Sequence, residues 1–341
     1  MAAGGKQQPP HFCPRMGVKK GDKVLQDNAK QPPLSGGAIW IGRGDLRARI
    51  LFTGASLQDL RLAPFANPLV LSLPDAAYCG AQRSFYAGAV VGRVAGRIGQ
   101  ACAPFGAGQL ALDTNEGAHH LHGGAHGFAH RDWHVSAHSA HSVTLTLRSP
   151  AGEGGYPGTV DVTAIYTVLP DAVLSLRLVA RSDADTVLNL CHHPYFNLNG
   201  APQIDGHTLE CPAQTYLPAD AAALPTGEVA AVAGTEFDFR TQRAIGSSAF
   251  DNSLCLHTAP CGPLAFAARL GAGPDAPVME IWTTQPALHI YDGAGIGHAP
   301  RAALALEAQG WPDAPNNPHF PSITLTSGAV YDQTTEYRFF V

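Results

Sequence analysis

The sequence predicts an all-β protein built as a large antiparallel sandwich. Only 14% of its 341 residues are charged, against about 25% in an ordinary soluble domain, and exposed helix faces need many Lys and Glu side chains. The chain also contains 37 glycines and 27 prolines, which suit many short strands joined by tight turns. Because hydrophobic residues make up 45% of the chain, it has enough apolar surface for a large core, and general disorder is excluded.

The N-terminal segment differs from the rest of the chain. Between Gly4 and Pro33 the sequence is rich in Gly, Pro, Lys and Gln and has no apolar period. Residues 1–37 are therefore expected to form a flexible tail. No composition break, charge run or linker divides residues 38–341, which are expected to form a single domain.

Within residues 38–341 the dominant pattern is a two-residue alternation of apolar and polar side chains, typical of half-buried strands. The pattern is clear in 142–148, 159–169 and 174–180, and the Pro170-Asp171 turn predicts a hairpin between the last two segments. No segment combines a 3.6-residue period with helix caps. Further strands are predicted at 46–63, 186–198, 279–292, 302–307 and 329–341.

Charge and cysteine content exclude several classes of partner. A net charge of −5 gives no electrostatic basis for binding nucleic acid. No apolar run approaches the 18 or so residues of a membrane span, and the N-terminus has no apolar segment of a secretory signal. The seven cysteines are scattered without a CxxC pair, which predicts reduced thiols in a cytoplasmic protein.

Histidine is concentrated in one segment, where eight of the sixteen lie between positions 119 and 141. Five of the eight are spaced by four residues, which on a helix would suggest a metal site. However, three glycines interrupt the segment, and on a strand the same spacing would place the rings too far apart to share one ion. We therefore predict no metal centre there, and a mostly exposed or loop-borne set of polar side chains.

Two further residues stand where chemistry is plausible. His193 lies where an apolar strand meets a loop, so it either presents its imidazole to a cleft or is an ordinary core or surface histidine. Glu307 is embedded in the apolar segment Leu304–Gln309, so it is either a general base or a solvent-facing strand residue. The residues alone leave both alternatives open.

Six motifs in order resemble those of the aldose 1-epimerase (galactose mutarotase) family, and the resemblance covers nearly all of residues 38–341. The matching segments are Gly92–Ile98, Asn115–Trp133, His193–Leu198, Tyr216–Pro218, Gly234–Arg240 and Glu307 with Pro312–Asn316. The resemblance implies a β-supersandwich that interconverts the α- and β-anomers of a free aldose without a cofactor.

The resemblance also implies roles for individual residues. Glu307 would be the base for the C1 hydroxyl and His193 the acid for the ring oxygen. His122 and Arg97 would bind sugar hydroxyls and the ring region, with His122 stabilising charge on the oxygen. Asp251 would accept bonds from sugar hydroxyls. The aromatic side chains of Tyr195 and Trp311 either flank the apolar face of the sugar or serve only in packing.

Three positions depart from the family pattern. Gly96 stands where the family has Asn, His289 where it usually has Gln, and Asn252 where His is common. All three lie on the substrate side, so the chemistry is better supported than the identity of the sugar. The alternatives are a hexose-6-phosphate 1-epimerase, which needs cations near C6, and a non-catalytic sugar-binding or sensing protein. The expected partner is a small sugar, and the expected assembly is a monomer or homodimer.

Overall fold

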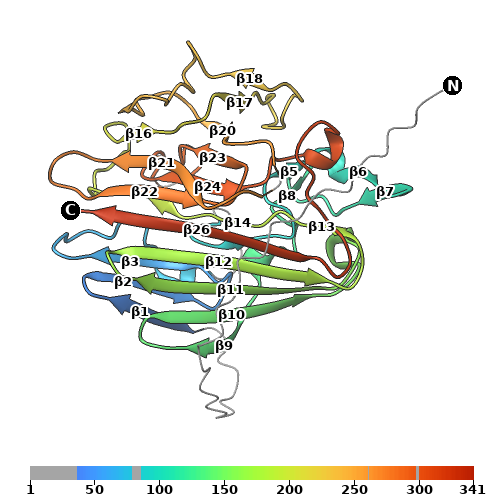
Figure 1. Ribbon diagram of the computed structural model, residues 1–341, viewed down its shortest axis with the longest axis horizontal. Helices are drawn as coiled ribbons and strands as arrows, with labels where there is room; N and C mark the ends of the chain where they lie inside the picture. Colours follow the sequence, from blue (N-terminus) through green and yellow to red (C-terminus); the bar gives the residue numbers. More distant parts are fainter. Residues whose placement is uncertain (1–36, 79–85, 260, 297–298) are drawn as a thin grey trace.

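A computed structural model describes residues 37–78, 86–259, 261–296 and 299–341. In these residues the regular structure consists of β-strands and short 3₁₀ turns, and the strand pairs of the large sheets are antiparallel, which confirms the predicted fold class (Figure 1). No helix of the described residues is long and apolar enough to cross a membrane. Apart from Gly37, the predicted tail lies outside the described residues, and the single-domain assignment remains a prediction. The 3₁₀ turns are η1 (Asp75–Tyr78), η3 (Gly99–Ala101), η4 (Phe128–His130), η5 (Glu153–Gly155) and η6 (Ala314–Asn316).

The largest layer is a nine-stranded sheet in which the last strand of the chain lies in the middle. In spatial order its strands are β19 (Arg243–Ala244), β16 (Thr208–Glu210), β21 (Ala265–Gly271), β22 (Val278–Thr283), β26 (Val330–Phe340), β12 (Val173–Ser182), β11 (Val160–Leu169), β10 (Ser142–Ser149) and β9 (His134–His138).

Two smaller sheets pack with it. The six-stranded sheet has the order β15 (Tyr195–Phe196), β24 (Leu304–Gln309), β23 (Ala287–Tyr291), β20 (Asp251–Cys255), β17 (Thr215–Leu217) and β18 (Ala230–Ala231). The three-stranded sheet has the order β1 (Ala38–Arg43), β2 (Leu46–Leu51) and β3 (Leu57–Leu62). Two-stranded pairs complete the set: β13 (Thr186–Val187) with β25 (Thr324–Leu325), β14 (Cys191–His192) with β4 (Val90–Val91), β5 (Arg97–Ile98) with β8 (His120–Leu121), and β6 (Cys102–Phe105) with β7 (Gly108–Ala111).

The predicted alternation in the central strands is confirmed. In β11 the even-numbered side chains are buried and the odd-numbered ones are partly or fully exposed. The buried face carries Val160, Val162, Ala164, Tyr166 and Val168. The predicted hairpin joins β11 to β12, with Leu169 opposite Val173. Its turn places Asp171 and Ala172 in the left-handed region, at φ values of 59° and 54°.

Three predicted strands are wrong in extent. Segment 46–63 is a hairpin of β2 and β3, because Gly54 and Ala55 adopt positive φ and turn the chain. Segment 186–198 is three short strands, each paired with a different partner strand. Segment 279–292 is divided between two sheets, β22 in one and β23 in the other, with Pro286 between them.

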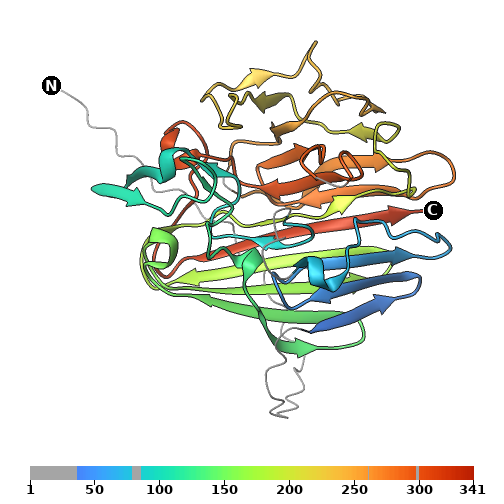
Figure 2. The ribbon, with the colours of Figure 1, turned by 180° about the vertical axis from the view of Figure 1, so that it is seen from behind.

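One apolar core joins the layers. β1 and β2 lie against β10, β11 and β12, as the blue and green strands show from both sides (Figures 1 and 2). Buried side chains of the six-stranded sheet, such as Leu288 and Leu304, belong to the same cluster as those of the nine-stranded sheet. The sheets are therefore held together by burial of their facing apolar surfaces.

Arg93 is a buried cation that fixes the loop after β10. Its guanidinium donates to Ser149 Oγ at 2.8 Å and to the backbone carbonyls of Ser149, Pro150 and Pro157 at 2.8–2.9 Å. Burial lowers the pKa of Arg93 to about 10, with the nearby charge of Glu153 opposing that change. Because Ser149 is buried, Arg93 is needed to satisfy its carbonyl and hydroxyl oxygens.

We predict that Arg93→Met lowers the free energy of unfolding by roughly 2–4 kcal/mol, since it removes the hydrogen bonds of the guanidinium and leaves the buried Ser149 carbonyl without that donor. Urea denaturation followed by circular dichroism measures the effect. The matched control is Arg47→Met at an exposed strand position, which should change stability by no more than about 0.5 kcal/mol. Equal losses in the two variants would contradict the structural role of Arg93.

Candidate active site

The structure brings Glu307 and His193 into direct contact. Glu307 lies on β24, where every residue is buried, and its side chain is 1% exposed. His193 lies between β14 and β15. Strand β15 pairs with β24, and Tyr195 lies opposite Ala305 in that pairing. His193 Nε2 lies 3.2 Å from Glu307 Oε1. Burial lowers the pKa of His193, and the negative charge of Glu307 opposes that change.

The second oxygen of Glu307 has a partner that the sequence did not indicate. The buried thiol of Cys191 donates to Glu307 Oε2 over 3.2 Å. Burial, followed by the charge of Glu307, raises the pKa of Cys191 well above its ordinary value, so the group remains a thiol. A thiol is a weak donor, so it holds the carboxylate in place without strongly reducing its capacity to accept a proton.

His122 faces this pair from the loop after β8. Its ring packs edge-on against that of His193, with centroids 5.5 Å apart. Two hydrogen bonds join His122 to Gly96. The backbone N–H of His122 donates to the Gly96 carbonyl at 3.1 Å, and the backbone N–H of Gly96 donates to the ring atom His122 Nδ1 at 3.2 Å. Burial, then the positive charges of His193 and Arg97, lower the pKa of His122 well below its ordinary value. The neutral ring therefore carries its proton on Nε2.

The backbone of Gly96 explains why an unusual residue stands there. Its φ is +75°, a conformation that residues with side chains rarely adopt, and a Cβ atom would lie 2.8 Å from Pro312 Cβ. The position therefore contributes only backbone to the cavity wall, and Pro312 occupies the place where an amide side chain would begin.

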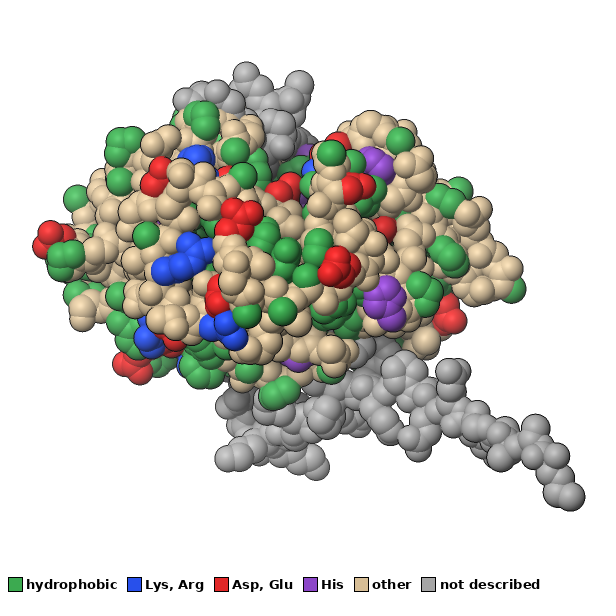
Figure 3. Space-filling model, turned by 90° about the horizontal axis from the view of Figure 1, so that it is seen from above, with side chains coloured by type: hydrophobic (Ala, Val, Ile, Leu, Met, Phe, Trp, Pro, Cys, Tyr) green, Lys and Arg blue, Asp and Glu red, His purple; other side chains and the backbone are tan. Residues whose placement is uncertain are grey.

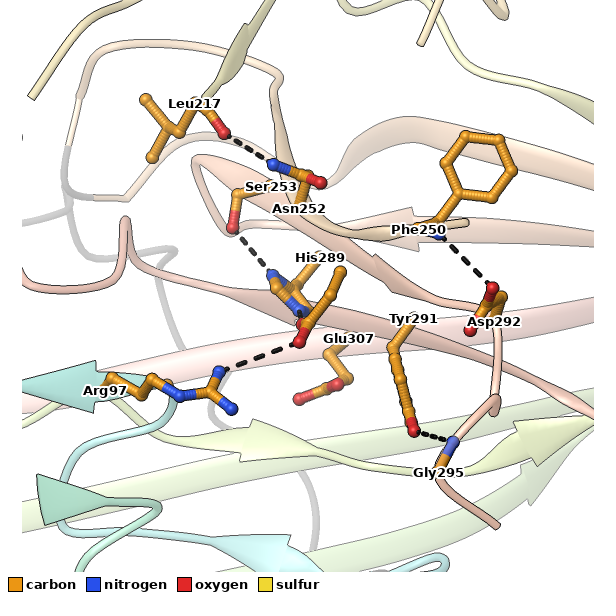
Figure 4. Close-up of polar contacts among 12 residues, drawn as sticks. Arg97, Leu217, Phe250, Asn252, Ser253, His289, Tyr291, Asp292, Gly295 and Glu307 are labelled. Atoms are coloured by element: carbon orange, nitrogen blue, oxygen red, sulfur yellow. Dashed lines mark hydrogen bonds and ion pairs between the residues drawn. The ribbon is translucent and has the colours of Figure 1, made fainter. Parts of the chain in front are cut away.

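Asp251, His289 and Arg97 form a charged network across the strands β20, β23 and β5. Figure 4 shows Arg97 and His289 of this network, with Ser253 and Glu307 nearby. His289 Nε2 lies 2.9 Å from Asp251 Oδ1, and His289 Nδ1 lies 3.0 Å from Ser253 Oγ. Arg97 Nη1 lies 3.8 Å from Asp251 Oδ2, while its other nitrogens bind Glu116.

The network favours the charged forms of both of its inner members, His289 and Asp251. Burial opposes protonation of His289, but the bond to Asp251 and the charges of Glu307 and Asp251 raise its pKa above the ordinary value. Burial likewise opposes ionisation of Asp251, but His289 and Arg97 hold the pKa of that carboxyl below its usual range. An ionised carboxylate is thus presented beside Glu307.

These groups line one cavity of about 280 Å³, close to the lower end of the roughly 300–1,000 Å³ typical of small-ligand sites. All eight residues to which the family resemblance gives a catalytic or sugar-binding position, apart from Trp311 and Asn252, contribute to its wall. The lining residues are Tyr86, Gly96, Arg97, Leu121, His122, His193, Tyr195, Ala223, Asp251, His289, Tyr291, Gly295, Glu307, Gln309 and Pro312.

Other expectations about the site are corrected or extended. Trp311 does not line the cavity, because it packs against Phe320 in a separate apolar cluster. The Asn252 amide donates to the Leu217 carbonyl and also lies outside the lining. Tyr86, which no motif indicated, packs its ring 4.6 Å from that of His122.

The remaining histidines of segment 119–141 do not converge on the cavity. His120 is buried and bonds to Asp113 and Tyr156, His141 approaches the Gly42 carbonyl, and His134 and His138 are exposed on β9. Among the described residues, His122 is the member of the segment that joins a group with metal-ligand geometry, together with Glu307 and His193. That the protein has no resident metal stays a prediction.

The cavity and the outer surface carry little positive charge. Arg97 is the one Arg or Lys among the lining residues of the described chain, since Arg93 is committed to the loop after β10. On the face shown in Figure 3, acidic and basic side chains are scattered among neutral ones. Neither feature favours a polyanionic ligand.

Comparison with known proteins identifies the family. Residues 38–338 match the family model described as aldose 1-epimerase. Galactose mutarotase of Bos taurus is 37% identical over 279 residues, covering 76% of this chain and 80% of the relative. Aldose 1-epimerase of Escherichia coli K12 is 31% identical over 284 residues, covering 76% and 82%.

A solved structure agrees with these matches. The aldose epimerase homologue from C. elegans superposes with a TM-score of 0.83 at 30% identity, covering 89% of this chain and 99% of that chain. The chain therefore belongs to the aldose 1-epimerase family and is an isomerase that interconverts the α- and β-anomers of aldoses.

Proposed function

We propose that the cavity opens and recloses the ring of a free aldose, with Glu307 as the base and His193 as the acid. The observation that carries this proposal is the 3.2 Å contact between His193 Nε2 and Glu307 Oε1 at the wall of a small cavity. A base and an acid so close together can act on two adjacent oxygens of one sugar, the C1 hydroxyl and the ring oxygen.

The reaction needs only proton transfers. Glu307 takes the proton of the C1 hydroxyl, the C1–O5 bond breaks as the carbonyl forms, and His193 delivers a proton to O5. Rotation about the C1–C2 bond exposes the other face of the aldehyde. O5 then attacks that face while His193 takes back its proton and Glu307 returns one to the C1 oxygen. Atoms and charge balance without a metal or nucleotide.

His122 has the properties of a neutral hydrogen-bond donor in this scheme. The Gly96 N–H occupies Nδ1, so the proton sits on Nε2, and its lowered pKa keeps the ring uncharged. We assign it the stabilisation of negative charge that develops on a sugar oxygen, the task of a preorganised donor in a water-poor site.

Asp251 and Arg97 are assigned to the sugar hydroxyls. Asp251 offers an ionised acceptor, and Arg97 is held by Glu116 with one nitrogen directed to Asp251. His289 occupies one oxygen of Asp251, and Gly96 offers no side chain to a sugar hydroxyl, so these two positions bear on which sugar fits. The single arginine of the lining favours a free aldose over a hexose phosphate.

The cellular compartment and the oligomeric state are further parts of the proposal. The described cysteines Cys102, Cys191, Cys211 and Cys255 are free thiols, which supports a reducing, cytoplasmic setting. The proposed reaction on a free aldose supports a role in hexose metabolism. A monomer or homodimer, with no nucleic-acid partner, remains our expectation.

We predict that Glu307→Gln and His193→Asn each lower kcat for mutarotation by roughly 10²-fold or more, with smaller changes in KM, because proton transfer occurs in the transition state. Polarimetry of freshly dissolved α-galactose, α-glucose and α-xylose measures the rates. Glu336→Gln, which removes a carboxylate on β26 outside the cavity, is the matched control.

Two results would contradict these assignments. One is kcat near that of the wild type in either variant, with the fold intact by circular dichroism. The other is the absence of any rate above buffer when EDTA-treated wild-type protein is tested on a broad panel of hexoses and pentoses.

A second prediction concerns the proton on His193. Because the charge of Glu307 raises the pKa of His193 against the effect of burial, Glu307→Gln should shift that pKa further down. NMR titration of ¹³C-labelled histidine, with the signal assigned by its loss in His193→Asn, tests the sign. In the wild type, kcat/KM should have a bell-shaped pH profile. Its alkaline limb should have an apparent pKa below that of an ordinary histidine, since activity is lost as His193 loses its proton. An unchanged or raised pKa in the variant would refute the coupling.

A third prediction separates binding from chemistry. Asp251→Asn and Arg97→Lys should raise KM by about 10-fold or more, because each weakens a charge-assisted bond to a sugar hydroxyl. The losses should differ between sugars that differ at one hydroxyl. Initial rates over a range of sugar concentrations measure them, with Asp238→Asn, whose partner is Arg240 at the surface, as control. Equal losses for every sugar, carried by kcat alone, would argue against this assignment.

A further inference from the structure

We propose that the cavity also binds a divalent transition-metal ion, Zn²⁺ in particular, through His122, His193 and Glu307, and that the ion inhibits the enzyme by competing with sugar. The inhibition rests on the proposed roles of these residues, whereas the binding site itself rests on their geometry alone.

The three side chains form a compact set of ligands. One ligand atom from each lies within 4.8 Å of the others, and all three residues are buried. Bonds of about 2.0–2.1 Å place two ligands of a tetrahedral zinc ion roughly 3.4 Å apart, and His193 Nε2 and Glu307 Oε1 are separated by 3.2 Å. Two histidines and one glutamate, with a fourth position open to a cavity, form a ligand set that zinc accepts.

The surroundings hold one of the ligands in place. Cys191 donates to the oxygen of Glu307 that does not face His193. A hydrogen bond to the far side of a metal ligand fixes its orientation and strengthens binding. Burial lowers the pKa of both imidazoles, which favours the neutral form that a metal requires.

Other features oppose tight retention of the ion. For His122 Nε2 to bind a metal, its proton must move to Nδ1, where it would face the Gly96 N–H. The positive charges of Arg97 and His289 lie at the same cavity and repel a dication. We therefore expect reversible binding, displaced by chelators, with catalysis by the metal-free form.

The other histidines of segment 119–141 provide a control for adventitious binding. His134 and His138 are exposed on β9, where four residues of strand separate them by roughly 13 Å. They cannot share one ion, so their removal should leave the cavity site intact.

The test uses full-length, tag-free, EDTA-treated protein titrated with ZnCl₂ in a calorimeter. We expect one site per chain, weakened at least about 10-fold by His122→Asn and by Glu307→Gln, since losing a bond that merely orients a ligand costs 10–100-fold. A His134→Asn/His138→Asn double variant should bind as the wild type does. MgCl₂ should give no comparable site, because Mg²⁺ prefers oxygen ligands.

The competition is tested in the same titration and by polarimetry. An excess of D-galactose or D-glucose should weaken zinc binding, and zinc should raise the apparent KM until EDTA is added. Binding that is unchanged in both His122→Asn and Glu307→Gln, with both folded by circular dichroism, overturns the site, as does the absence of a stoichiometric site in the wild type. If the wild type bound zinc through His122 but did not accelerate mutarotation, the metal site would stand and the proposed function would fail.

Discussion

The buried carboxylate of Glu307 is the constraint around which the site is built. A charge that is 1% exposed is strongly destabilising unless it has partners. Its two oxygens are met by His193 and Cys191, which come from one short segment made of β14 and the residues just after it. The position of that segment is thereby coupled to β24, and the same coupling brings the acid within reach of the base.

Strand register then decides what surrounds this pair. His289 lies opposite Glu307 on β23, and Ser253 lies opposite His289 on β20. Because side chains alternate between the faces of a sheet, these polar residues share one face, while Leu304 and Leu306 enter the core on the other. The six-stranded sheet is thus apolar on one side and forms the floor of the cavity on the other.

The sequence was sufficient where local pattern or motif determines the outcome. Alternation in 159–169 has a single interpretation, because only one face can be apolar, and the motifs placed Glu307 and His193 in a family context. The bond from Cys191 to Glu307 joins residues 116 positions apart, so no local pattern could indicate it. The sequence left Trp311 between sugar contact and packing, and the structure shows packing: Pro312 lines the cavity, while the indole turns into a separate cluster. In the sequence, Gly96 indicates only the loss of the asparagine side chain that the family has at this position. The structure shows why glycine fits there: the backbone has a positive φ, and Pro312 lies too close for a side chain.

The central place of β26 has a consequence for biosynthesis. This strand pairs with β12 on one side and β22 on the other, so it alone joins the two halves of the nine-stranded sheet. Ribosomes add the chain from its N-terminus, and β26 is the last strand of that sheet to be made. Until it docks, β12 and β22 expose long unpaired edges next to apolar faces, which are the surfaces that lead nascent chains to aggregate. Completion of the sheet is therefore the step at which this protein depends most on rapid folding or on shelter by a chaperone.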